Sequence, residues 1–400
     1  MKNYRHIVKL MNEIKANLLN NKYKNKEEIK NDFFKTLDLV WKNLKNSDRT
    51  DLTLMYKVNE FLIDEVCNIH TEENSEINEA VFKENISIQT AKENLEDGRR
   101  GCHIYSFKEP KCHYYIIGDI HSDTISIERI LEKTDFFHRV INKEKIKLIF
   151  LGDYVDRGKA HLKTLQCILT LKYLFPQNIY IQRGNHDGGS FEKGEIKLCV
   201  RMPEGEADKD WFLPYLYNLT ESNKTFPEAM IHKYLKLFDS LSNVSFICHE
   251  NIILLLTHGG IPRPLKEEKN PFIYIKSISD LTNESIVDCL GATIVNNMMW
   301  SDPAVTEDDL REGRKRFRFT EDHFEAFRKH IGFDIFVRGH QAEVKGCKKF
   351  FKDRLITVFS SGKILVKHKN INHETAYSDI KPKILEVNKE GEVLVLDLNS

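Results

Sequence analysis

Six short motifs place residues that can bind metal ions or transfer protons along the chain. In chain order they are Gly-Asp-Ile-His at 118–121, Gly-Asp-Tyr-Val-Asp-Arg-Gly at 152–158, Arg-Gly-Asn-His-Asp at 183–187, His-Gly-Gly at 258–260, Trp-Ser-Asp-Pro at 300–303 and Arg-Gly-His-Gln at 338–341. They supply six candidate ligands: Asp119, His121, Asp153, Asn185, His258 and His340. These oxygen and nitrogen donors are sufficient for two divalent metal ions, with Mn favoured and Fe or Zn also suitable.

Such a ligand set predicts hydrolysis of a phosphoester. Two metal ions about 3.5–4 Å apart can share a carboxylate and a solvent molecule. A single bound Zn²⁺ already lowers the pKa of water to about 7, so a metal-bridging hydroxide is expected to attack phosphorus in line. The leaving alkoxide needs a proton, for which His186 is the candidate donor, with Asp156 as the partner that orients it. Arg157 offers a planar guanidinium to the phosphate oxygens.

Each motif also has a purely structural explanation. His258 alone reads as a buried core histidine, and Trp-Ser-Asp-Pro at 300–303 is expected to form a turn with a packed aromatic ring. Asp153, Asp156 and Arg157 are harder to explain in this way, because charges that follow an apolar strand are costly unless they are paired or bind metal. The ordered occurrence of all six motifs therefore favours the metal site.

The elements that position these residues are predicted to be buried strands. Short apolar runs that end in Gly and polar residues cover 114–117, 147–151, 179–182, 252–257 and 334–337. This pattern is typical of strands that end in tight turns. Ligands in open α/β sheets gather beyond the carboxyl ends of the strands, so all the candidates are expected on one rim. Glycines at 118, 152, 184, 259 and 339 should let the backbone approach the metals closely.

At these motifs the chain resembles the phosphoprotein phosphatase family of serine/threonine phosphatases, within the calcineurin-like metallophosphoesterases, over about residues 112–362. The resemblance implies an α/β fold with a central sandwich of two mixed β-sheets flanked by helices. It implies that Asp153 bridges the metals, with Asp119 and His121 on one ion and Asn185, His258 and His340 on the other. It also implies His186 as acid, Asp156 as its partner and Arg157 as phosphate clamp.

The chain departs from the family pattern at four places. Ser122 replaces a Gly, and Asp187 replaces a Glu, an ending that also occurs in nucleotide-cleaving relatives. The second phosphate-binding Arg falls within 311–317, where Arg314 is our choice and Arg311 and Arg316 remain alternatives. Ser-Ser-Gly-Lys at 360–363 replaces the Ser-Ala-Pro-Asn-Tyr-Cys loop of the eukaryotic enzymes. The chain therefore looks more like the bacterial-type members, and eukaryotic-type regulatory subunits are not expected.

The overall composition bounds the partners and the compartment. Lys plus Arg and Asp plus Glu both number 60, so the net charge of zero gives no indication of a nucleic acid or membrane partner. No apolar run reaches the roughly 18 residues of a membrane span. We recognise no signal peptide, so the eight cysteines are expected to be reduced and the protein cytoplasmic.

Three segments surround the motifs. Residues 1–97 are predicted to be a helical region, and 98–400 a catalytic domain that includes a C-terminal β-hairpin at 383–398. The apolar stripe that includes Phe33, Leu37 and Val40 favours packing on the catalytic domain, while binding of a regulatory partner remains the alternative. Residues 187–230 follow His186 directly and are candidates to wall the substrate cleft, although core packing is expected for most of their aromatic residues.

The leading functional hypothesis is a metal-dependent phosphatase acting on phosphoserine or phosphothreonine in proteins. The second is a hydrolase of dinucleoside polyphosphates or another small phosphoester, an alternative that Asp187 supports. The third is an inactive metallophosphoesterase that serves as a binding scaffold. The presence of all six candidate ligands and of His186 argues against the third, because a scaffold needs no proton donor.

Overall fold

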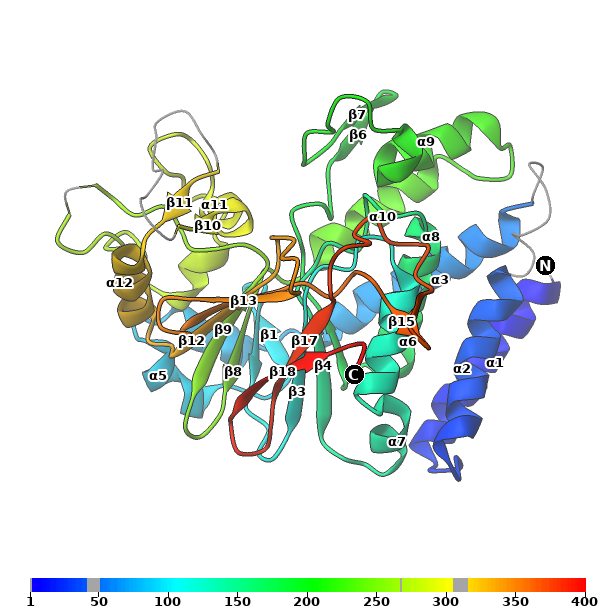
Figure 1. Ribbon diagram of the computed structural model, residues 1–400, viewed down its shortest axis with the longest axis horizontal. Helices are drawn as coiled ribbons and strands as arrows, with labels where there is room; N and C mark the ends of the chain where they lie inside the picture. Colours follow the sequence, from blue (N-terminus) through cyan, green and yellow to red (C-terminus); the bar gives the residue numbers. More distant parts are fainter. Residues whose placement is uncertain (1, 42–50, 267, 305–315) are drawn as a thin grey trace.

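Two β-sheets face each other at the centre of the molecule. The computed structural model of the protein describes residues 2–41, 51–266, 268–304 and 316–400. The first sheet has the strand order β1-β2-β8-β9-β12-β14-β13, and the second has the order β18-β17-β3-β4-β5. Helices flank the two sheets (Figure 1). This arrangement confirms the mixed α/β sandwich predicted from the sequence.

The strands predicted before the motifs are present, and those of each set run parallel to one another. The first sheet contains β1 (Arg99–Gly101), β2 (Ile104–Phe107), β8 (Val244–Cys248), β9 (Ile253–Thr257), β12 (Ile335–Arg338), β13 (Cys347–Phe350) and β14 (Leu355–Val358). The second contains β3 (His113–Ile117), β4 (Ile146–Phe150), β5 (Ile179–Ile181), β17 (Lys383–Val387) and β18 (Val393–Asp397). β3, β4 and β5 are parallel, as are β9, β12 and β14. The C-terminal hairpin β17–β18 pairs with β3 and so extends the second sheet.

Side chains alternate between the two faces of each strand and build three apolar cores. Ile116 of β3 and Leu256 of β9 lie in the core between the sheets. Ile117 packs in a second core with α6 (Thr124–Lys133), α7 (Phe136–Ile141) and α8 (His161–Leu174). Leu255 packs in a third core, whose helices are α4 (Glu76–Lys83), α5 (Ile88–Ala91), α11 (Ile294–Trp300) and α12 (Glu321–Ile331). The central strands β3, β4 and β9 are thus buried on both faces, which holds their ends in fixed positions.

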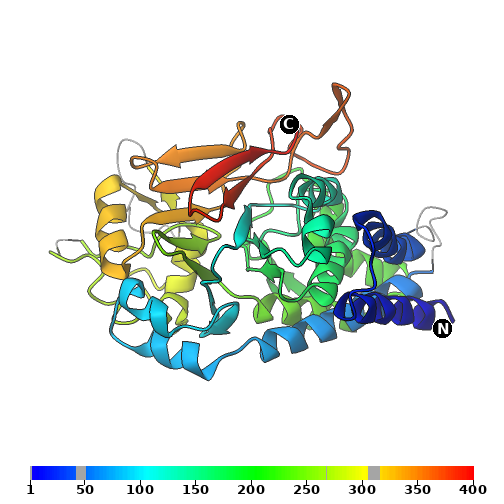
Figure 2. The same cartoon turned by 90° about the horizontal axis from the view of Figure 1, so that it is seen from below.

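The first three helices pack beside α8 and α10. They are α1 (Lys2–Leu19), α2 (Lys26–Trp41) and α3 (Thr53–Glu72), and α10 spans Ala229–Ser240 (Figures 1 and 2). Phe33, Leu37 and Val40 on α2 are each no more than 1% exposed. Trp41 Nε1 donates a hydrogen bond to Gln166 Oε1 on α8 at 2.6 Å. The apolar stripe is therefore buried, as packing on the catalytic region requires. None of the helices described here is long and apolar enough to cross a membrane.

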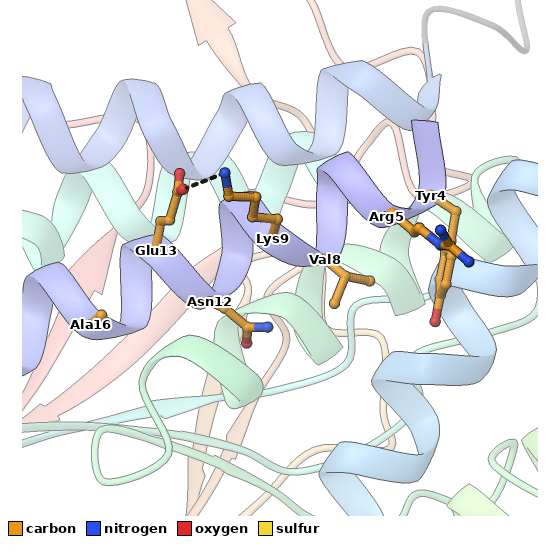
Figure 3. Close-up of a pocket in the computed structure, with 7 residues that line it drawn as sticks. All are labelled: Tyr4, Arg5, Val8, Lys9, Asn12, Glu13 and Ala16. Carbon is orange, nitrogen blue, oxygen red and sulfur yellow. Dashed lines mark ion pairs between the residues drawn. The ribbon is translucent and has the colours of Figure 1, made fainter. Parts of the chain in front are cut away.

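One side of α1 carries a hollow of about 420 Å³ (Figure 3). Its lining residues are Tyr4, Arg5, Val8, Lys9, Asn12, Glu13 and Ala16. Lys9 Nζ and Glu13 Oε1 form an exposed ion pair at 3.5 Å beside it. Other residues of the same helix, Ile7, Met11 and Ile14, are buried. α1 therefore has one face committed to the core and another that remains accessible.

Shorter elements rise above the rim of the sandwich. Residues 187–230 form the hairpin β6 (Ser190–Glu192) and β7 (Glu195–Lys197), followed by α9 (Phe212–Ser222), at the top of Figure 1. β10 (Asp302–Pro303) pairs with β11 (Arg318–Phe319) and also lies high in Figure 1, whereas β15 (Leu365–Val366), which pairs with β16 (Lys369–Asn370), lies lower in that view. These segments come from loops between the sandwich strands, so they can cover the site without disturbing the sheets.

Candidate metal centre

The structure brings all six predicted ligands to one rim of the sandwich. Asp119 and His121 follow β3, Asp153 follows β4, and Asn185 follows β5 in the second sheet. His258 follows β9, and His340 comes two residues after β12, in the first sheet. Asp119, Asp153 and His258 each offer a ligand atom within 4.8 Å of the others, as do His121, Asp153 and His186. The two sheets therefore contribute to a single centre.

Asp153 lies between the two halves of this centre. Its Oδ2 atom is 3.5 Å from His121 Nε2 and 3.4 Å from His258 Nε2. Asp119 Oδ2 is 3.6 Å from the same His121 nitrogen. On the other side, Asn185 Oδ1 lies 2.7 Å from His258 Nε2 and 3.0 Å from His340 Nδ1. One carboxylate oxygen thus faces both groups, as a bridging ligand must.

Hydrogen bonds turn two of the imidazoles so that Nε2 faces the centre. Nδ1 of His121 lies 2.9 Å from the carbonyl oxygen of Val155, and Nδ1 of His258 lies 3.2 Å from that of Leu151. A carbonyl can only accept, so Nδ1 carries the proton and the Nε2 of the neutral ring is left with a lone pair. This is the tautomer that a metal-binding histidine needs.

The donor set fits divalent cations on the evidence of its own electrostatics. The neutral His258 would direct its Nε2 lone pair at Asn185 Oδ1 and Asp153 Oδ2, which are also acceptors. Burial lowers the pKa of His258, but the negative charge of Asp153 outweighs it and raises the pKa to about 9. A proton on His258 therefore supplies positive charge of the kind that a metal ion would bring. Asp119 Oδ2 is likewise buried without a hydrogen-bond partner among the described residues. The centre is built to hold cations.

His340 is kept neutral by its surroundings. Burial, followed by the nearby charges of His258 and Arg338, holds the pKa of His340 well below its usual range. The ring of Trp300 packs against it with centroids 5.6 Å apart. A neutral imidazole retains the lone pair that a metal ligand requires.

The candidate proton donor stands beside the centre with its predicted partner. His186 Nδ1 is 2.7 Å from Asp156 Oδ2, and both side chains are buried. The other oxygen, Asp156 Oδ1, accepts a hydrogen bond from the backbone N–H of Phe212 at 2.7 Å. The rings of His186 and His121 have centroids 4.9 Å apart. Asp156 therefore fixes the orientation of an imidazole that borders the ligands.

Arg157, the predicted phosphate clamp, lies over an aromatic ring. Its Cζ atom is 5.6 Å from the ring centroid of Trp211, and its backbone N–H donates to the carbonyl of Asp210 at 2.6 Å. Its Nε is buried and has no hydrogen-bond partner among the described residues. A guanidinium held in this way keeps donors available for an oxyanion.

Asp187 has a structural task that the sequence did not reveal. Its two carboxylate oxygens accept hydrogen bonds from the backbone N–H groups of Asp153, Tyr154 and Gly184, at 2.7, 2.9 and 2.8 Å. Both oxygens are therefore occupied in joining the loops after β4 and β5. Burial and the neighbouring Asp153 raise the pKa of Asp187 to about 7. The side chain of Asp187 therefore helps to hold the two loops that carry Asp153 and Asn185.

Trp-Ser-Asp-Pro does not form the predicted turn, because Trp300 ends α11 and Asp302–Pro303 forms β10. The ring of Trp300 is packed as expected, and Asp302 has a charged role. Asp302 Oδ1 lies 3.0 Å from Nη2 of the fully buried Arg338, and Asp302 Oδ2 accepts from Nε of Arg316 at 2.6 Å. Arg314, predicted as the second phosphate ligand, lies outside the described residues, as does Arg311. Arg316 is the described member of that basic run that comes nearest to this cluster.

Several site residues have backbone conformations that ordinary side chains avoid. His121, Asp153, Asp156, Arg157 and His340 have φ angles of 44°, 56°, 66°, 65° and 70°. Each such residue costs of order 1–3 kcal/mol, so the surrounding structure must impose the strain. Glycine is needed where the ligand loops cross: a Cβ on Gly184 would lie 2.2 Å from Asp153 Oδ1. This agrees with the close approach predicted for the motif glycines.

Two contacts with the ligand loops come from residues that sequence reasoning missed. The ring of Tyr377 packs on His121 with centroids 5.4 Å apart. Ser122 Oγ is 2.6 Å from Nδ1 of the buried His161, whose Nε2 reaches the carbonyl of Lys209 at 3.0 Å. The unusual Ser122 was a signal at this place, but Tyr377 lies far from any motif.

A family model described as calcineurin-like phosphoesterase matches residues 113–344, which covers more than half of the chain and every described ligand loop. This chain belongs to the calcineurin-like phosphoesterase family. The family assignment agrees with the resemblance drawn from the motifs. The ligand loops described above are therefore parts of a known phosphoesterase framework.

Two proteins of similar sequence are named as serine/threonine-protein phosphatases. A probable serine/threonine-protein phosphatase of Encephalitozoon cuniculi is 27% identical over 286 residues, which cover 69% of this chain and 53% of that protein. Serine/threonine-protein phosphatase BSL2 of Arabidopsis thaliana is 27% identical over 256 residues, 62% of this chain and 22% of that protein. The chain thus spans about half of the first relative and less of the second.

A solved structure supports the fold. A protein serine/threonine phosphatase from Saccharomyces cerevisiae, described as similar to human phosphatase PP5, superimposes with a TM-score of 0.51 at 16% identity. The superposition covers 84% of this chain and 90% of that one. It therefore extends beyond the residues of the family match.

Proposed function

We propose that this calcineurin-like phosphoesterase is a dinuclear metal-dependent phosphatase that hydrolyses phosphoserine or phosphothreonine in proteins. One observation carries the proposal: six candidate ligands from two sheets gather at one rim, with Asp153 Oδ2 between His121 and His258, and the His186–Asp156 pair stands beside them. The names of the relatives support the substrate class. An inactive scaffold is disfavoured, because the chain retains the His186–Asp156 pair as well as all six candidate ligands.

Asp119, His121 and Asp153 would hold one metal ion, and Asp153, Asn185, His258 and His340 the other. When bound, the two ions supply positive charge for the phosphoryl oxygens and acidify water at neutral pH. We propose Mn²⁺, while Fe or Zn would also suit this mixture of imidazole, carboxylate and amide donors. Asp187 maintains the arrangement by tying the backbone of Asp153 to that of Gly184.

The remaining residues act on the substrate. Arg157 binds the phosphoryl oxygens through its guanidinium, whose Nε has no hydrogen-bond partner among the described residues, and orients the phosphorus toward the centre. His186 donates a proton to the leaving alkoxide, because a serine or threonine oxygen leaves poorly without one. Asp156 accepts from His186 Nδ1 and so keeps the transferable proton on Nε2. Arg314 is retained as a candidate second contact to phosphate, with Arg316 as its alternative.

The test is a comparison of substrates on the Mn²⁺-loaded protein. The panel contains a phosphothreonine peptide, a dinucleoside tetraphosphate and para-nitrophenyl phosphate, with the metal-free protein as control. We expect the phosphopeptide to give a higher kcat/KM than the dinucleotide. A preference for the dinucleotide above about tenfold, equivalent to roughly 1.4 kcal/mol, would instead select the small-phosphoester alternative. If the metal-loaded protein hydrolyses none of these substrates, the result would favour the inactive binding scaffold.

A further inference from the structure

Trp211 is a fully buried tryptophan whose neighbours include the proposed machinery. It is 0% exposed, yet it lies outside the three apolar clusters formed by the described residues. Its ring stacks on His186 with centroids 5.7 Å apart and 30° between the planes. The guanidinium of Arg157 lies 5.6 Å from its centroid. One indole therefore touches both the proton donor and the phosphate clamp.

The chain on both sides of Trp211 makes further contacts with the same groups. Immediately after it, the N–H of Phe212 donates to Asp156 Oδ1 at 2.7 Å. Immediately before it, the carbonyl of Asp210 accepts from the N–H of Arg157 at 2.6 Å. The segment 206–212 is thus attached to the donor, to its carboxylate partner and to the clamp.

Glu206 sets the position of the indole. Trp211 Nε1 donates a hydrogen bond to Glu206 Oε2 at 2.7 Å. Glu206 itself is exposed, as are most residues from 201 to 209. An exposed loop thus inserts one large side chain completely, and the indole N–H finds its partner on that loop. The hydrogen bond anchors one edge of the indole, so the carboxylate helps to set the position of the ring against which His186 and Arg157 rest.

We propose that Trp211 is a positioning residue that holds His186 and Arg157 in one mutual arrangement, and that Glu206 fixes the indole in place. This inference rests on the proposed function, since it assumes that His186 gives the proton and Arg157 binds the phosphoryl group. Both must engage the same phosphoester, and a displacement of about 1 Å costs on the order of 10²-fold in rate. A single rigid ring in contact with both restricts their independent movement.

Glu206 provides the first test because its exposed side chain can be changed without a cavity. Glu206→Ala removes the acceptor of the indole N–H, whereas Glu206→Gln keeps an acceptor oxygen. Glu204→Ala is the matched control, since Glu204 is 97% exposed in the same loop and pairs with Arg201 at 3.8 Å. We expect Glu206→Ala to lower kcat on a phosphothreonine peptide by about tenfold, and Glu206→Gln to restore most of it. Equal rates for Glu206→Ala and Glu204→Ala would overturn the role of Glu206.

The role of Trp211 is tested with Trp211→Leu and Trp211→Phe. Phe191→Leu is the control, because Phe191 is a buried aromatic residue in the same segment, 187–230. The ring of Phe191 packs near those of Tyr217 and His232, neither of which has a role in the proposed reaction. Trp211→Leu should lower kcat on the phosphothreonine peptide by about 10- to 100-fold. The loss should be smaller on para-nitrophenyl phosphate, whose leaving group hardly needs a proton. Equal losses on both esters, or an equal loss in Phe191→Leu, would show a general structural effect. If Trp211→Leu fails to fold, Trp211→Phe and the Glu206 pair decide.

Binding of inorganic phosphate to the Mn²⁺-loaded protein, measured by calorimetry, gives a readout that does not depend on turnover. Trp211→Leu should weaken phosphate binding by about 2- to 30-fold, the range expected for a lost cation–π contact. In an Arg157→Ala background the same change should have no further effect, because the coupled partner is gone. Additive losses would overturn the proposal. A wild-type protein that binds phosphate but hydrolyses neither ester would refute the proposed function, while this double-mutant cycle would still decide the coupling to Arg157.

Discussion

At the scale of the residue, Asp153 connects the two halves of the proposed centre through a single oxygen atom. Asp153→Asn should lose most of the metal and nearly all activity, because the amide cannot neutralise two cations. Metal content of the purified variant, measured by elemental analysis, checks this. Asp208→Asn is the control, since it removes the same charge from an exposed position of the neighbouring loop. Two equivalents of metal in Asp153→Asn, with near-normal turnover, would exclude Asp153 as the bridge.

His186 differs from its neighbours because it is expected to act on the leaving group without binding metal. His186→Asn should therefore keep both metals and lower turnover by roughly 10²–10⁴-fold, the usual contribution of a general acid. The loss should shrink on aryl phosphates, which leave without protonation. Parallel kinetics on a phosphothreonine peptide and para-nitrophenyl phosphate provide the measurement. If both substrates lose the same factor, or if metal is lost as well, His186 has another role.

At the scale of the element, the helices around the sandwich bury polar groups where they pack against one another. His70 on α3 is 1% exposed, and its Nδ1 lies 3.0 Å from Ser240 Oγ at the end of α10. Burial, then the charges of Lys172 and Arg100, lower its pKa well below 6.5. The contact between α3 and α10 should therefore be sensitive to acid.

The sign of this effect follows from proton binding. As the pH falls below about 6.5, the unfolded chain takes up a proton at His70 and the folded chain does not. The stability that the folded state has above that pH is therefore lost as the pH falls, by at most about 1.4 kcal/mol per pH unit. His70→Gln should reduce the fall in Tm between about pH 7.5 and 5.5. Thermal unfolding beside the exposed control His6→Gln measures it. An unchanged slope in His70→Gln would contradict the prediction.

At the scale of the whole molecule, the division between residues 1–97 and 98–400 remains a prediction. Removing residues 1–97 leaves every proposed ligand in the chain, since the first is Asp119. It also exposes the core partners of Phe33 on α2, Phe82 on α4 and Ile88 on α5, each of which is fully buried. We expect the 98–400 fragment to aggregate, as size-exclusion chromatography and light scattering would show.

The opposite result would support a regulatory module. A monomeric, fully active 98–400 fragment would mean that the N-terminal helices are dispensable for folding. A change in substrate preference or partner binding in that fragment would then point to the accessible face of α1 (Figure 3). The full-length protein purified in parallel is the control for both outcomes.

The sequence by itself determined the five strands that precede the motifs, the C-terminal hairpin, the six candidate ligands and the contact between His186 and Asp156. Each candidate ligand lies within four residues of the end of an apolar strand, and parallel strands bring their carboxyl ends to the same rim, so local order in the chain becomes proximity in space. Asp153, for example, follows β4 by three residues. The strand that precedes such a residue therefore places it at the rim.

Only the tertiary structure decided which side chains surround those ligands. Trp211 and Tyr377 reach His186 and His121 from long connections whose course is set by packing, and no periodic pattern encodes that course. The hydrogen bonds from three backbone N–H groups to the carboxylate of Asp187 were also not predictable from the sequence. The left-handed backbone of His121 and His340 likewise exists because surrounding contacts impose it. The motifs specify the candidate ligands, whereas long-range packing determines which side chains surround and orient them.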